Sequence, residues 1–154
     1  MAMTAFKGCV ASLFFAAAVL TAQQQPKFDG NWQMDTAKSH VTDSRVVSLT
    51  IVAVADGIKM TMKTHKGDGQ ETTAEFTSKL NGRACEIAEQ GHTSKLTVWY
   101  DGPTLNACKE NGPVGDVTSM WKFVLSQDKQ NMTMTISHLD PVADDETLVF
   151  TKKS

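Results

Sequence analysis

The stretch FDGNWQMDTAKSH, from Phe28 to His40, is where this chain first has the pattern of a folded protein. It follows the polar segment AQQQPK, contains a strand-like run, NWQMDT, and ends within a loop, AKSHVTDS, which continues to residue 44. Gly30 and Trp32 stand one residue apart at the start of the run. Any account of the fold has to explain why a glycine and a tryptophan are needed there.

The remainder of the chain repeats this pattern of a short run followed by turn residues. The clearest run is IKMTMKTH, where Ile58, Met60 and Met62 alternate with polar residues. The dipeptides DG and NG, and clusters such as KGDG and QDKQN, separate the runs. We count about eight to ten strands at the spacing typical of all-β domains and no sustained helical period. The sequence therefore predicts an all-β fold, a single antiparallel meander closed into a barrel, with a β-sandwich as the competing architecture.

The first residues have the composition of a secretory signal. Lys7 precedes the apolar run CVASLFFAAAVL, and small residues follow it. The run is shorter than the ~20 residues that a membrane-spanning helix needs. We therefore expect residues 1–22 to be a signal peptide and residues 23–154 to form one exported barrel domain, in the periplasm or outside the cell.

Charge and cysteine content narrow the class of protein further. The chain has 15 basic and 17 acidic residues without a basic patch, so no nucleic-acid partner is expected. Two cysteines, Cys85 and Cys108, lie beyond the signal. Because an oxidising compartment permits pairing, we predict a disulfide between them, with a reactive or metal-binding thiol pair as the alternative.

Alternation along each run predicts which side chains face the interior. Besides the three residues of IKMTMKTH, the expected interior includes the residues that we list next as a possible ligand cavity. It also includes Ala74, Leu96, Val117, Leu125, Leu148 and Phe150. The predicted cavity residues are Met60, Met62, Phe76, Val98, Tyr100, Trp121, Phe123, Met132, Met134, Ile136 and His138. The methionines suit a flexible apolar cavity, but they could equally fill the barrel. Trp99 has the opposite parity and is expected on the outer surface.

The phrase FDGNWQMD resembles the opening of the lipocalin and fatty-acid-binding protein superfamily, the calycins. The segments GNWQMDTAKSH, LSQDKQNMTMT and ETLVFTKK look like small secreted bacterial barrels of lipocalin-like type. The resemblance implies that Trp32 plugs one end of the barrel and that Gly30 lets the first strand start close to its neighbour. It also implies that a basic residue near the end of the chain packs over the tryptophan. Lys152 is the candidate, because it shares the inward-facing parity of Leu148 and Phe150. The carboxylate-binding arginines of fatty-acid binders cannot be placed, since Arg45 and Arg83 both lie next to turns.

Motifs for catalysis are missing from the sequence. It contains no nucleophile elbow and no phosphate-binding loop, and its four histidines are scattered. His138 alone continues an inward parity and could contact a ligand or act as a base, although a rim histidine bonded to a carbonyl or water is the simpler interpretation. The run Asp144, Asp145, Glu146 is expected to be a solvated turn. No cofactor, metal or catalytic residue is predicted.

The sequence thus favours a non-enzymatic exported barrel that binds a small hydrophobic or amphipathic molecule. The alternative is a filled barrel that acts as an envelope or surface interaction protein. A stable membrane span is not expected, and a small apolar ligand is the partner that the pattern favours.

Overall fold

All regular structure in the computed structural model, which describes residues 25–111 and 115–154, is β-structure. The predicted signal peptide, residues 1–22, lies outside the described residues. The ten strands are β1 (Gly30–Met34), β2 (Val46–Val54), β3 (Gly57–His65), β4 (Glu71–Ser78), β5 (Asn81–Glu89), β6 (His92–Asp101), β7 (Thr104–Asn111), β8 (Asp116–Leu125), β9 (Asn131–His138) and β10 (Glu146–Lys153). Within the described part, no helix is long and apolar enough to cross a membrane.

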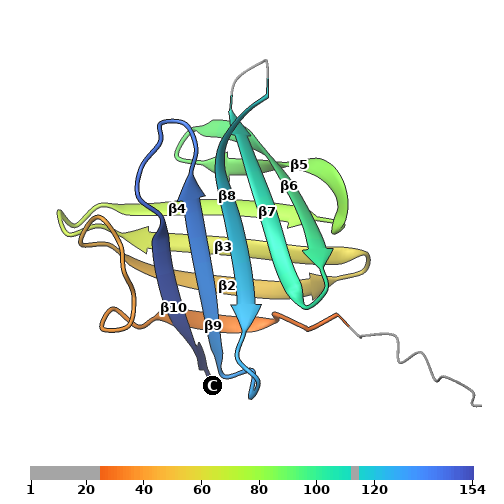
Figure 1. Cartoon of the computed structure of the whole chain (residues 1–154), viewed down its shortest axis with the longest axis horizontal. Helices are drawn as coiled ribbons and strands as arrows, with labels where there is room; N and C mark the ends of the chain where they lie inside the picture. Colours follow the sequence, from red (N-terminus) through yellow and green to blue (C-terminus); the bar gives the residue numbers. More distant parts are fainter. Residues whose placement is uncertain (1–24, 112–114) are drawn as a thin grey trace, which may run out of the picture.

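The strands form one closed antiparallel barrel in which each strand pairs with its neighbours in the sequence. The first and last strands close the sheet, because β1 pairs with both β2 and β10. In Figure 1, β2 and β3 run across the direction of β7, β8 and β9, so the sheet coils strongly as it closes. The predicted all-β meander and barrel are confirmed, and the β-sandwich alternative is wrong.

The alternating apolar positions converge on one interior, as the sequence predicted. Met60 on β3 and Met134 on β9 are 1% and 0% exposed, and both belong to a single cluster of buried hydrophobic side chains. One predicted inward residue is an exception. Val117 is 37% exposed, because the pairing of β7 with β8 shifts register between Lys109 and Glu110 and the end of β8 leaves the regular alternation.

The base of the barrel explains the glycine and the tryptophan of the opening stretch. Trp32 is 1% exposed, and its Nε1 donates to the carbonyl oxygen of Phe28 at 2.9 Å. The Lys152 ammonium lies 5.3 Å from the centroid of the Trp32 ring, as the resemblance implied. Gly30 has φ +139°, and a Cβ there would lie 2.5 Å from Cε of Lys152. Gly30 is therefore required both by its backbone conformation and by the lysine that packs on Trp32.

The disulfide predicted between Cys85 and Cys108 is wrong, because both thiols are free. Cys85 on β5 pairs with Leu96 of β6, whereas Cys108 on β7 pairs with Thr97. Leu96 and Thr97 are consecutive residues of one strand, so their side chains point to opposite faces of the sheet. Cys85 consequently faces the interior and Cys108 the outer surface, with β6 between them. A disulfide between Cys85 and Cys108 would therefore require the backbone to move.

The base of the barrel generates a prediction about stability. We expect Trp32→Ala to lower the free energy of unfolding by about 3–5 kcal/mol, since it opens a large cavity under the apolar cluster. Gly30→Ala should cost on the order of 1–3 kcal/mol from its backbone conformation, with an added clash against Lys152. Urea unfolding followed by tryptophan fluorescence and circular dichroism measures both.

A double variant separates the two contributions at Gly30. Combining Gly30→Ala with Lys152→Ala removes the clash but not the backbone strain, so the two losses should be less than additive. Strict additivity would contradict the close approach of Lys152 to Gly30.

Candidate functional site

The two ends of the barrel differ in chemistry. β10 begins at Glu146 and ends near Lys152, so Glu146 lies at the end opposite the Trp32 base. We call this end the mouth. β5 and β7 also end there, with Glu89 and Lys109. The mouth therefore carries ionic side chains above an apolar interior.

The predicted cavity residues all come from inward-facing positions of the strands. The buried ones are Met60, Phe76, Val98, Trp121, Phe123, Met132 and Met134. Met62, Tyr100 and Ile136 are partly buried and pack against the same cluster. Tyr100 lies nearest the base, where its hydroxyl donates to the carbonyl oxygen of Pro26 at 2.7 Å. Trp99, which was expected on the outer surface, is half-buried.

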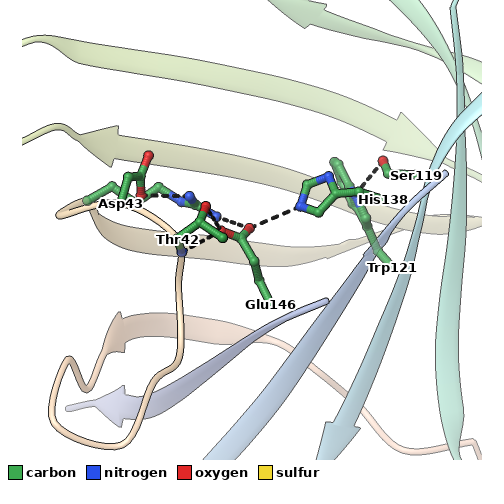
Figure 2. Close-up of polar contacts among 7 residues, drawn as sticks. Thr42, Asp43, Ser119, Trp121, His138 and Glu146 are labelled. Carbon is green, nitrogen blue, oxygen red and sulfur yellow. Dashed lines mark hydrogen bonds and ion pairs between the residues drawn. The ribbon is translucent and has the colours of Figure 1, made fainter. Parts of the chain in front are cut away.

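Glu146 is the centre of a polar network at the mouth (Figure 2). Its side chain is 1% exposed, and its Oε1 accepts from the backbone N–H and the hydroxyl of Thr42 at 2.9 and 2.7 Å. Oε2 accepts from the Arg45 guanidinium and lies 3.3 Å from Nε2 of His138. Each carboxylate oxygen thus has two polar partners, which compensates for its removal from water.

The expectation that Glu146 is a solvated turn residue is wrong. Burial alone would raise the pKa of Glu146, but the hydrogen bonds from Arg45 and Thr42 outweigh it and lower the pKa to about 2. The carboxylate is therefore charged throughout the physiological range. A permanently ionised, fully bonded carboxylate orients its neighbours and holds charge, but it is a poor proton acceptor.

The loop between β1 and β2 supplies two partners of this network at the rim of the mouth. After β1 ends at Met34, residues 35–45 are fastened to β10 by backbone hydrogen bonds between His40 and Thr147 and by the N–H of Val149, which donates to Oγ of Ser39 at 2.9 Å. These contacts bring Thr42 and Arg45 to Glu146. The loop AKSHVTDS is consequently tethered to β10 at the rim of the mouth.

A second ion pair occupies another side of the mouth. Oε2 of Glu89 lies 2.6 Å from Nζ of Lys109 and 3.5 Å from Nε2 of His92. The Glu89 and Lys109 side chains are 18% and 16% exposed. They line a pocket of about 220 Å³ together with Met62, Thr64, Thr72 and Ala74. Its lining thus combines the apolar side chains of Met62 and Ala74, threonine hydroxyls and a pair of opposite charges.

Sequence reasoning placed the apolar interior but missed most of the mouth. Glu146 shares the parity of Leu148 and Phe150, and Arg45 shares that of Val47 and Leu49, so both could have been recognised as inward-facing. No local sequence pattern indicated that Arg45 and Glu146 pair, because the starts of β2 and β10 are brought together only by closure of the barrel. His138 is at the rim as expected, 34% exposed, with Glu146 as its neighbour.

Comparison with known proteins identifies the fold. No family model and no curated protein matches the sequence. Among solved structures, one described as the REP1-NXSQ fatty acid transporter superposes with a TM-score of 0.62. It is 13% identical to this chain, and the match covers 82% of this chain and 96% of the other. The likeness is one of fold and is consistent with a lipocalin-like barrel.

The Glu146 network leads to a prediction about acid stability. The pKa of Glu146 is lower in the folded protein than its ordinary 4.5, so its contribution to stability is present above about pH 4.5 and is lost as the pH falls towards 2. The loss over this window should be on the order of 3 kcal/mol. Glu146→Gln should lower stability at neutral pH by about 3 kcal/mol, since it leaves Arg45 without its buried partner, and should remove this part of the pH dependence.

Denaturant titrations at a series of pH values test this prediction, with Glu75→Gln as the matched control. Glu75 pairs with Lys59 at 2.9 Å on the outer surface, where both side chains are nearly half exposed. Because this pair is largely solvated, the control should differ from the wild type far less than Glu146→Gln does. A Glu146→Gln profile parallel to that of the wild type would contradict the account of the network.

Proposed function

We propose that this chain is an exported, non-enzymatic binding protein that holds one small hydrophobic or amphipathic molecule inside the barrel. The observation that carries the proposal is the closure of ten strands into one barrel. A barrel of about eight strands is wide enough to be filled by side chains or to hold one small ligand, and the diameter grows with strand number. Ten strands therefore favour an interior with room for a ligand.

The lining suits a ligand of variable shape. Met60 and Met62 come from β3, and Met132 and Met134 from β9, which is separated from β3 in the barrel by several strands on either side. Methionine side chains are unbranched and polarizable, so they adapt to different apolar shapes at little cost. The removal of apolar surface from water, worth about 25 cal/mol per Å², would drive binding.

The polarity of the barrel favours an amphipathic molecule over a purely apolar one. Its base is closed by Trp32 and its middle is apolar, while the mouth presents Thr64, Thr72 and two ion pairs. A chain inserted tail first would leave its polar end among these groups. The solved fatty acid transporter of similar fold is in keeping with such a ligand.

Binding without chemistry is favoured by the state of the one buried acid. His138 and Glu146 are close enough to suggest an acid–base pair, but Glu146 is held ionised by Arg45 and Thr42. A carboxylate so stabilised does not take up a proton near neutral pH. Export is supported by the signal-like pattern of residues 1–22.

The alternative, a filled barrel that acts through its surface, draws on the loop between β9 and β10. Val142 and Leu139 are 85% and 45% exposed there. Two exposed side chains beside the mouth are a small apolar surface, and isolated exposed hydrophobic residues are common. The interior is therefore a stronger candidate for the functional site than this surface.

Titration with the uncharged fluorescent probe N-phenyl-1-naphthylamine tests the proposal, and native mass spectrometry of the purified protein complements it. Ala74→Trp places a large ring at an inward-facing, half-buried position that lines the pocket with Glu89 and Lys109. We expect this variant to weaken probe binding by about tenfold, because the ring takes up ligand space. Ala88→Trp is the matched control, since Ala88 is exposed on the outer face of β5.

The controls decide between the two functions. A wild-type protein that binds no probe and carries no co-purified molecule would refute the proposal and leave the filled barrel. Equal effects of the two tryptophan substitutions would show that the probe binds outside the interior.

A further inference from the structure

The ionic groups of the mouth lead to an inference about the ligand that rests on the proposed function. In the described residues, the inward-facing charges of the mouth are two acids and two bases. Glu146 is paired with Arg45, and Glu89 with Lys109. Arg45 has a second acidic partner, because its Nη1 lies 2.7 Å from Oδ1 of Asp43. Neither base is left with an uncompensated positive charge.

We infer that the ligand is a single-chain amphipathic molecule with an uncharged head group, such as an alcohol or an ester, and that free carboxylates are selected against. A carboxylate that enters the mouth would find both inward-facing bases of the mouth in the described residues, Arg45 and Lys109, already paired with acids. It would lose its hydration and approach the buried carboxylate of Glu146 and the partly buried one of Glu89. Competition for Arg45 or Lys109 would leave one of these acids buried without its partner, which is costly.

The remaining polar groups of the mouth suit an uncharged head group. Thr64 and Thr72 line the pocket beside the Glu89–Lys109 pair, and Ser119, 7% exposed, accepts from Nε1 of Trp121 at 3.0 Å. Hydroxyl groups both donate and accept, so they can bond to an alcohol or an ester without a net charge. Met62 and Ala74 line this pocket and also pack against the buried cluster, so the pocket adjoins the apolar interior.

The other inward-facing base does not change this balance. Lys152 lies at the opposite end of the barrel, against Trp32 and Gly30. A ligand whose head group remains at the mouth does not reach it. Selectivity against carboxylates therefore depends on the acids that neutralise the two bases of the mouth.

A matched set of ligands that share a twelve-carbon chain tests the inference. Dodecanol, methyl dodecanoate and dodecanoate are compared at neutral pH by displacement of N-phenyl-1-naphthylamine from the full chain, below their critical aggregation concentrations. We expect the alcohol and the ester to bind the wild type about tenfold or more tightly than the carboxylate. The three ligands have the same chain length, so the comparison isolates the head group.

Removing the acidic partner of a mouth base should reverse the preference for uncharged head groups over carboxylates. Glu89→Gln leaves Lys109 without its carboxylate, and we expect it to raise the affinity for dodecanoate by about tenfold while changing that for dodecanol little. Glu146→Gln combined with Asp43→Asn, which removes both acidic partners of Arg45, is the second variant should the first fold poorly. Glu75→Gln on the outer surface is the control and should leave all three affinities unchanged.

The outcomes separate this inference from the proposed function. Wild-type protein that binds dodecanoate as well as dodecanol overturns the inference but leaves a ligand-binding barrel. Failure of both folded variants to gain affinity for dodecanoate also overturns it. No binding of the probe or of any of the three ligands overturns the proposed function itself.

Discussion

Pairing of the first strand with the last is the constraint on which the rest of this structure depends. β1 has only five residues, yet it joins β2 to β10 and leaves the sheet without a free edge there. Trp32 lies in this seam, opposite Lys152 on one side and Leu49 on the other. Its indole bonds to the chain just before β1 and fills the base, so one side chain both secures the closing strand and seals the interior.

Closure also decides what the mouth contains. Glu146 at the start of β10 faces inward because it has the parity of Leu148 and Phe150, and closure brings β2 and the loop before it within reach. A buried carboxylate without partners would be strongly destabilising, so Thr42 and Arg45 are required there. The Glu89–Lys109 pair compensates another inward-facing acid at the same end. The mouth is polar and almost neutral as a result, which is the basis for expecting an uncharged head group.

Most of the fold could be predicted from residue patterns. The turns around Gly57 and Gly82 and the alternation in β3, β9 and β10 indicated an antiparallel barrel with Met60 and Met134 inside. Errors arose where local pattern and long-range geometry differ. Val117 follows the expected parity, but the register shift opposite it moves it out of the core. Cys85 and Cys108 have a suitable separation in sequence, but the alternation of Leu96 and Thr97 places them on opposite faces.

The sequence by itself determined which face each strand buries, where the chain turns, and the Gly30–Trp32 pair that begins the barrel, because these depend on the two-residue period of a strand and on local backbone conformation. Only the tertiary structure decided the partners of inward-facing ionic residues. Arg45 and Glu146 are far apart in the chain, and either alone on an inward position looks like an exposed turn residue. Their pairing depends on the register of the strands in the closed barrel, and the sequence of a single segment does not specify that register.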